Sequence, residues 1–222
     1  MPDGSAGSGG TAPGSHGLGS DGLDGDGLGG DAPGSDGPGS DGPGGAVHIL
    51  PGIDALLRSR IRDVPDYPRP GIVFKDITPL LGDAAAFAAA VSALAAGNTG
   101  VTKVAGIEAR GFIFAAPVAC ALRAGFVPIR KQGKLPARTY AQSYELEYGE
   151  ATLEVHADAF GPDDRVLIVD DVLATGGTAA ATVQLIRRTG ATVTGISVLL
   201  ELGFLAGRTK LPGLDVRSLV AT

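Results

Sequence analysis

Cysteine is almost absent from the sequence. Its 222 residues contain one, Cys120, so no intrachain disulfide can form. Cys120 stands in an apolar, helix-like pattern, and we expect a buried structural thiol there rather than a nucleophile. We find no signal sequence, and the longest uncharged apolar stretch, residues 111–122, is too short to span a bilayer. These absences favour a soluble, cytoplasmic protein without membrane contact.

Lys, Arg, Phe, Tyr and Trp are missing from the first 45 positions, which consist mainly of Gly, Ser, Asp and Pro. Because they also lack Val and Ile, little there offsets the entropy lost on ordering. We expect residues 1–46 to be a disordered tail, or to precede the true translation start, and residues 47–222 to form one domain. Removing the seven aspartates of the tail leaves 17 of the 24 acidic residues, against 18 basic ones. A near-neutral domain without a basic stripe does not indicate nucleic-acid binding.

Apolar periodicity beyond residue 52 alternates between that of helices and that of strands. Helices are predicted over residues 53–64, 83–96, 112–123 and 178–188. Strands are predicted over residues 103–107, 126–129, 165–169 and 193–200, with a β-hairpin from 144–148 and 152–156. This alternation predicts an α/β fold: a mostly parallel central sheet flanked by helices, with the hairpin over the active site.

The segment RVLIVDDVLATGGT, residues 165–178, carries the clearest functional signal. Its apolar run is typical of a strand buried on both faces, and Asp170 and Asp171 follow at the end where open α/β sheets bind ligands. The next residues supply backbone N–H groups at a helix start, which suits a phosphate; they are Ala174, Thr175, Gly176, Gly177 and Thr178. Two carboxylates before a phosphate-binding turn predict a ribose 5-phosphate ligand.

A plain strand–turn–helix crossover is the alternative interpretation, with Asp170 only capping the turn. The acidic pair alone does not exclude that alternative, whereas the whole run favours the ligand site. No Lys follows Gly177, so the segment is not a Walker A loop, and its glycine spacing is not that of a dinucleotide fingerprint.

The segment from Gly106 to Phe112 also follows a predicted strand and precedes a helix. Its glycines allow close backbone approach to a ligand, and Arg110 can bind an oxyanion through two N–H groups. A simple ion pair between Glu108 and Arg110 is the alternative. Because the segment lies at the same sheet edge as Asp170, we expect Ala109 and Arg110 to bind pyrophosphate.

The segment RKQGKLP, residues 130–136, places three cations at the end of a predicted strand. A solvated loop with incidental charge is the alternative for any such cluster. At this edge, however, we expect Arg130, Lys131 and Lys134 to bind pyrophosphate from a mobile lid that excludes water.

The segment from Tyr67 to Asp76 contains prolines at positions 68 and 70, which force extended backbone. Such a segment can present main-chain groups to the edge of a base while Val73 and Phe74 pack on its faces. The alternative is a linker that braces the core.

Together these segments resemble the type I phosphoribosyltransferases over about residues 53–202. The resemblance rests on five motifs in order: YPRPGIVFKDIT (67–78), EARGF (108–112), RKQGKLP (130–136), YELEYG (144–149) and DDVLATGGT (170–178). Lys75 stands where the family also uses Arg, a mild departure. The resemblance implies the type I fold, a homodimer, and a non-proline cis peptide near Glu108–Ala109–Arg110.

The resemblance also implies a purine salvage reaction, in which adenine and phosphoribosyl diphosphate give AMP and pyrophosphate. Mg²⁺ would enter bound to the substrate, without a ligand from the protein. Glu147 would donate a proton to N7 of adenine while N9 attacks, and Tyr148 would position phosphates or close the lid. Implied phosphoribosyl diphosphate contacts are Asp170, Asp171, residues 174–178, Ala109, Arg110, Arg130, Lys131, Lys134 and Tyr148; implied adenine contacts are Val73, Phe74 and Lys75.

The expected base is adenine because the residues around Ala181 supply no acid, unlike those of 6-oxopurine enzymes. Two alternatives stay open. One is a transferase for another base such as xanthine or orotate, and the other is a regulatory protein that senses phosphoribosyl compounds without chemistry.

Overall fold

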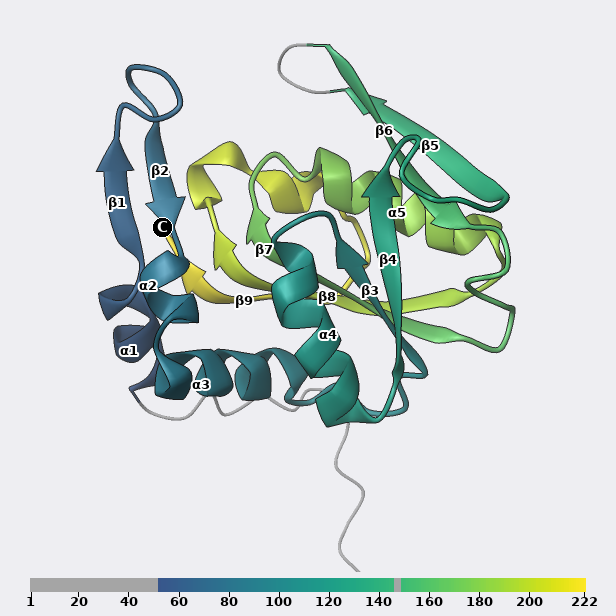
Figure 1. Cartoon of the computed structure of the whole chain (residues 1–222), viewed down its shortest axis with the longest axis horizontal. Helices are drawn as coiled ribbons and strands as arrows, with labels where there is room; N and C mark the ends of the chain where they lie inside the picture. Colours follow the sequence, from purple (N-terminus) through teal and green to yellow (C-terminus); the bar gives the residue numbers. More distant parts are fainter. Residues whose placement is uncertain (1–51, 146–148) are drawn as a thin grey trace, which may run out of the picture. The chain divides into compact units, whose positions relative to one another are not determined.

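The computed structural model describes residues 52–145 and 149–222 as helices and strands around one seven-stranded sheet (Figure 1). The predicted tail, residues 1–46, lies outside the described residues. The strand order is β5-β6-β4-β3-β7-β8-β9. Neighbours from β4 to β9 pair in parallel, and β6 pairs antiparallel with β4 and β5. The predicted mostly parallel α/β sheet is therefore confirmed.

The strands of this sheet match the predicted ones closely, with one addition and one shift: the first strand of the hairpin, predicted over residues 144–148, begins five residues earlier and is described only as far as Glu145. Their bounds are β3 Lys103–Ile107, β4 Gly125–Lys131, β5 Thr139–Glu145, β6 Glu150–His156, β7 Arg165–Leu173, β8 Thr192–Glu201 and β9 Val216–Ala221. The pattern of residues 216–221 predicted no element, and β9 pairs with the edge of β8.

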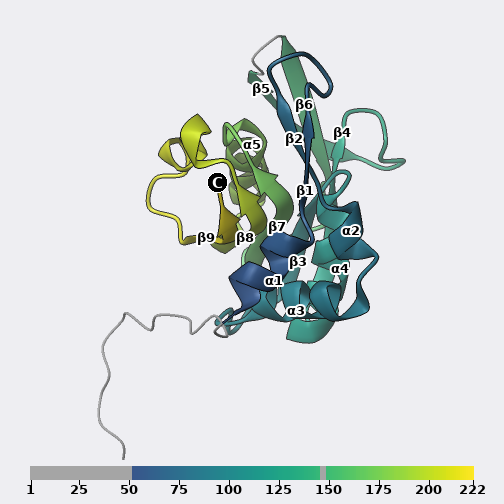
Figure 2. The ribbon, with the colours of Figure 1, turned by 90° about the vertical axis from the view of Figure 1, so that its left-hand side faces the viewer.

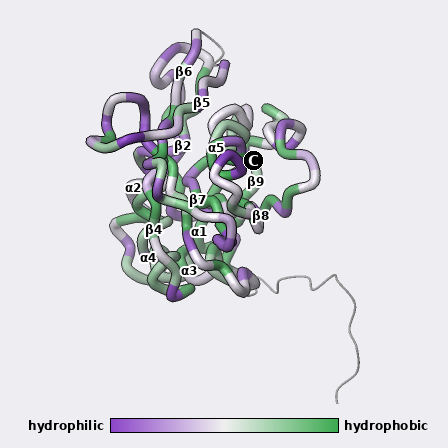
Figure 3. Tube along the Cα trace, turned by 90° about the vertical axis from the view of Figure 1, so that its right-hand side faces the viewer, coloured by the Kyte–Doolittle hydropathy of each residue, from purple (hydrophilic) through white to green (hydrophobic). Residues whose placement is uncertain are grey.

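Helices cover both faces of the sheet. The helices are α1 Ile53–Ser59, α2 Thr78–Leu81, α3 Ala84–Ala95, α4 Gly111–Leu122 and α5 Gly177–Arg188, with 3-10 turns η1 Gly203–Leu205 and η2 Gly207–Lys210. Alternate residues of β3 contribute to two cores: Val104 packs with α3 and α4, and Ala105 packs with α5. Figure 3 shows the apolar residues gathered along α3, α4 and the central strands, and polar residues in the β4–β5 connection.

The predicted helix over residues 53–64 is wrong in its second half. Helix α1 ends at Ser59, and β1 (Arg62–Pro65) follows and pairs antiparallel with β2 (Val73–Asp76). The apolar residues of this stretch satisfied a helical spacing, but Val64 pairs with Phe74 across the two strands. Pairing with a distant segment overrides the local pattern.

Two smaller expectations also need correction. Strand β7 continues to Leu173, so Asp170 and Asp171 lie within the strand rather than after it. The side chain of Cys120 is exposed rather than buried, because it lies on the outer side of α4 while Val118 and Ala119 face the core. Among the described residues, no helix is long and apolar enough to cross a membrane.

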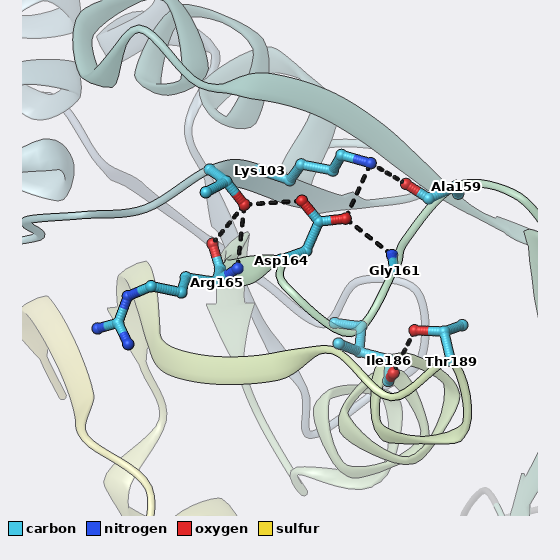
Figure 4. Close-up of polar contacts among 8 residues, drawn as sticks. Lys103, Ala159, Gly161, Asp164, Arg165, Ile186 and Thr189 are labelled. Carbon is cyan, nitrogen blue, oxygen red and sulfur yellow. Dashed lines mark hydrogen bonds and ion pairs between the residues drawn. The ribbon is translucent and has the colours of Figure 1, made fainter.

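A polar cluster ties together the amino-terminal ends of β3 and β7 (Figure 4). The Lys103 ammonium lies 3.0 Å from Asp164 Oδ2 and donates to the Ala159 carbonyl at 2.6 Å. The other oxygen of Asp164 accepts from the Thr102 hydroxyl at 2.8 Å. These bonds fix the β6–β7 connection at the sheet end opposite to the functional motifs.

Candidate active site

Three of the predicted functional segments, residues 106–112, 130–136 and 170–178, meet at the carboxyl ends of β3, β4 and β7. Figures 1 and 2 show the β1–β2 pair alongside one side of this edge and the β5–β6 hairpin alongside the other. Parallel strands bring their carboxyl ends to one edge, so segments distant in sequence converge there.

The acidic pair on β7 is the centre of this edge. Asp171 lies 2.7 Å from an Arg110 terminal nitrogen, and only 6% of the residue is exposed. Apart from this ion pair, the buried Asp171 Oδ2 has no hydrogen-bond partner among the described residues. The Asp170 side chain packs on the start of α4, where a Cβ at Gly111 would lie 2.6 Å from its oxygen.

Burial has the largest effect on the pKa values of Asp170 and Asp171. It raises the pKa of Asp170 well above the usual value, and repulsion from Asp171 raises it further. Burial also raises the pKa of Asp171, opposed by the Arg110 guanidinium. A site that holds two carboxyl groups at such cost is typical of a functional rather than a structural role.

The turn between β7 and α5 has the form expected of a phosphate site. Gly176 has a φ of 78°, a conformation that favours glycine, and α5 begins without a side-chain cap. The first N–H groups of α5 therefore stay open to an anion. A cavity of about 70 Å³ is lined by Asp170, Ala174, Thr175, Gly176 and Thr178 among others.

Glu108 binds two of the three cationic side chains of the predicted lid, those of Arg130 and Lys134. Its carboxylate lies 2.6 Å from the Lys134 ammonium and 3.2 Å from Arg130 Nε, and it accepts the Lys131 N–H at 3.1 Å. Burial alone would raise the pKa of Glu108, but hydrogen bonds from Lys134, Lys131 and Arg130 hold it below its usual value. The peptide between Glu108 and Ala109 is cis, as the resemblance implied. The alternative ion pair of Glu108 with Arg110 is wrong, because Arg110 lies against Asp171.

The β2 strand divides the predicted base-binding residues between two faces. The Phe74 ring lies 5.1 Å from the Arg110 guanidinium and therefore faces the site. Lys75 donates to Asp63 at 2.7 Å across the β1–β2 pair, so its side chain points away. Val73 is about half exposed. The side chain of Lys75 is thus not brought to the site, although its backbone borders Phe74.

The remaining candidates, Glu147 and Tyr148, lie outside the described residues. Sequence reasoning missed the parts played by Tyr144 and Gly207. The Tyr144 hydroxyl accepts from Thr178 at 3.3 Å, and Gly207 packs on the phosphate turn. Aromatic alternation in β5 was a usable signal for Tyr144, whereas no local pattern marks Gly207.

Comparison with known proteins agrees with this geometry. Residues 75–210 match the family described as phosphoribosyl transferase domain. An adenine phosphoribosyltransferase from Thermobifida fusca is 63% identical over 169 residues, covering 75% of this chain and 96% of the relative. The chain belongs to the phosphoribosyltransferase family.

Other members of this family show the same relationship in sequence and in structure. The Streptomyces coelicolor adenine phosphoribosyltransferase is 65% identical over 72% of this chain and 89% of its own length. The crystal structure of the Rhodothermus marinus adenine phosphoribosyltransferase has a TM-score of 0.73 and 51% identity, covering 77% of this chain and 98% of that one. The Giardia lamblia enzyme complexed with 9-deazaadenine has a TM-score of 0.72 and 39% identity, covering 76% and 97% of the two chains.

Proposed function

We propose that this chain converts adenine and phosphoribosyl diphosphate into AMP and pyrophosphate, a purine salvage reaction. The observation that carries the proposal is the convergence of the acidic pair, Arg110 and the phosphate turn at one sheet edge. Relatives above 60% identity that are named adenine phosphoribosyltransferase support the choice of base.

The ribose 5-phosphate half of the substrate fits β7 and its turn. The open N–H groups of residues 174–178 suit the 5′-phosphate, and Asp170 and Asp171 suit the 2′- and 3′-hydroxyls as acceptors. Negative charge from this pair also favours the positive charge that develops on the ribose ring as pyrophosphate departs.

Pyrophosphate fits the cations on the other side of the pair. Arg110 can bind it through two N–H groups, and Arg130 and Lys134, gathered on Glu108, can join it together with the Lys131 side chain. Neutralising the departing group lowers the barrier to its release. The β5–β6 hairpin and Tyr148 would then exclude water.

Adenine fits the space bordered by Phe74, with the β2 backbone at its polar edge. Attack by N9 requires that the proton of the neutral base be redistributed. We assign to Glu147 the donation of a proton to N7, help that is typically worth about 10²–10⁴-fold in rate.

Mg²⁺ carried by the substrate fits this site, because hard cations prefer oxygen and the acidic pair, with Asp171 buried, adds negative charge beside the ribose hydroxyls. When bound, the metal would supply positive charge against the pyrophosphate, while Asp170 and Asp171 would keep the ribose oriented.

Assembly and location complete the proposal. We propose a homodimer in the cytoplasm. Exposed Ile113 on α4 and Phe126 on β4, each 39% exposed, offer apolar surface for a second copy. Light scattering of the purified protein would give twice the 22.1 kDa chain mass, and a monomer mass would contradict this part.

The function is tested by following AMP and pyrophosphate formed from adenine, phosphoribosyl diphosphate and Mg²⁺. We expect equal amounts of the two products and no product when either substrate is omitted. Glu147→Ala should lower kcat at least about tenfold, while Glu150→Ala, on the exposed start of β6, should not. Binding of phosphoribosyl diphosphate without AMP formation would favour the regulatory alternative.

A further inference from the structure

The segment that follows β8 packs backbone to backbone against the phosphate turn. A Cβ on Gly176 would lie 2.3 Å from the Gly207 carbonyl oxygen, and a Cβ on Gly207 would lie 2.2 Å from the Ala174 carbonyl oxygen. Atoms at such distances overlap, so neither position accepts a side chain without movement of the turn. The turn therefore packs against residues 207–210, the segment that we call the wall. The proposed substrate contacts include no residue of this wall.

An ion pair between the buried Glu201 and the partly exposed Arg208 holds this wall in place. Arg208, the residue after Gly207, binds Glu201 through two bonds, Nε to Oε1 at 2.6 Å and a terminal nitrogen to Oε2 at 2.7 Å. It also donates to the Val216 carbonyl, and the Ser218 hydroxyl donates to Glu201 at 2.8 Å. The hydrogen bond from Arg208 holds the pKa of Glu201 below its usual value, so the pair is charged at neutral pH.

The pair connects the wall to the same strands that carry the turn. Glu201 ends β8 and lies opposite Leu173, the last residue of β7 and the residue immediately before the turn. Ser218 and Val216 belong to β9. Both sides of the Gly207–Gly176 contact are thus tied to one sheet. In Figure 1 the yellow-green turns after β8 lie beside the start of α5, and α5 contacts η2.

We propose that Arg208 and Glu201 are positioning residues, which fix Gly207 against the turn of residues 174–177 and so keep that turn shaped for the 5′-phosphate. The inference rests on the proposed function and names residues outside the substrate contacts. A turn that is already in its bound shape avoids an ordering cost when the ligand binds. Loosening the wall should therefore weaken phosphoribosyl diphosphate binding and spare adenine binding.

Four variants test this assignment. We expect Arg208→Met and Gly207→Ala to raise the KM for phosphoribosyl diphosphate about tenfold, with Arg208→Lys intermediate because it keeps the charge but loses the paired geometry. The KM for adenine should change less than about twofold in each. Arg217→Met is the matched control, because Arg217 forms a similar ion pair with Asp215 at 2.7 Å outside the wall.

A double variant separates positioning from stability. Arg208→Met leaves the buried Glu201 carboxylate without its cationic partner and so destabilises the fold, whereas replacing both residues by Met removes that unpaired charge and restores much of the loss. We therefore expect Glu201→Met with Arg208→Met to recover the melting temperature and to keep the raised KM for phosphoribosyl diphosphate. Recovery of that KM together with the melting temperature would overturn the proposal, as would equal changes in both KM values.

Calorimetric titration with phosphoribosyl diphosphate keeps the two proposals distinguishable. If the wild-type chain binds this ligand but forms no AMP, the proposed function fails, and weaker binding to the variants still supports the positioning role. If the wild-type chain forms AMP and the variants bind the ligand as tightly as it does, only the positioning role fails.

Discussion

The Lys134 ammonium lies 2.6 Å from the Glu108 carboxylate, whose side chain is only 7% exposed. The same carboxylate holds Arg130 and the Lys131 N–H. Two of the cations proposed to bind pyrophosphate, Arg130 and Lys134, are therefore gathered on one carboxylate at the site.

The variant Glu108→Gln tests whether holding Arg130 and Lys134 on this carboxylate promotes the binding of phosphoribosyl diphosphate. We expect the KM for phosphoribosyl diphosphate to rise roughly tenfold, because each released long side chain must be ordered again when the ligand binds. Steady-state kinetics at saturating adenine measures the effect. Glu154→Gln is the matched control, since its amide oxygen can still accept the Gly133 N–H of the same loop. A lowered KM in Glu108→Gln would contradict the account and identify Glu108 as a competing anion.

Phe74 and Lys75 provide a paired test of the base site on one strand. Phe74 faces Arg110, whereas the Lys75 side chain points to Asp63. Phe74→Leu should raise the KM for adenine about tenfold through lost ring contact, and Lys75→Met should change it less than about threefold, because it loses only a partly exposed ion pair. The opposite ranking would show that the base binds on the other face of β2.

We expect the Asp171 carboxylate to strengthen the binding of phosphoribosyl diphosphate and to lower the stability of the fold. Burial raises the pKa of Asp171, and its charge also raises the pKa of Asp170, so ionising it costs the folded state. Asp171→Asn should therefore leave the melting temperature unchanged or higher while the Kd for phosphoribosyl diphosphate rises about tenfold. Asp215→Asn, which breaks the ion pair with Arg217, is the control and should leave the Kd unchanged. A lower melting temperature with intact affinity would make Asp171 structural.

Asp164 should stabilise the fold without a part in the chemistry. Burial acts to raise its pKa, but hydrogen bonds from the Gly161 N–H, Lys103 and Thr102 hold it below the usual 3.8. A carboxyl group with a lowered folded pKa stabilises the protein above its unfolded pKa, and that contribution is lost as the pH falls through the folded value.

Denaturant unfolding of Asp164→Asn measures this contribution. We expect a loss of about 1–3 kcal/mol in the free energy of unfolding at pH 7, which shrinks below about pH 4, and unchanged kinetics. Exposed Asp163→Asn is the control. A loss that persists undiminished in acid would show that the carboxylate charge is not its source.

The sequence predicted the parts of the fold whose patterns are local. The apolar run of β7 and the Asp83-capped, alanine-rich α3 form nearly where their residues indicate. Strand β1 was missed because its partner β2 lies across a loop containing Pro68 and Pro70, and β9 because its pairing with β8 is non-local.

In the candidate site too, the features that follow from local motifs were predicted and those that depend on distant contacts were not. Motifs at strand ends placed Asp171, Arg110 and the phosphate turn at one edge correctly. They could not show that Lys75 points away, or that Arg208 reaches Glu201 beneath the turn, because both depend on side chains that meet only in the folded chain.

The central claim is a transferase that is selective for adenine, and a base comparison tests it most directly. The purified chain would receive phosphoribosyl diphosphate and Mg²⁺ with adenine, hypoxanthine, guanine or xanthine in separate reactions, and the nucleotides would be separated by chromatography. We predict AMP from adenine with one pyrophosphate per nucleotide, and no comparable product from the other bases. Equal or faster turnover of a 6-oxopurine, or no nucleotide from any base, would contradict the account.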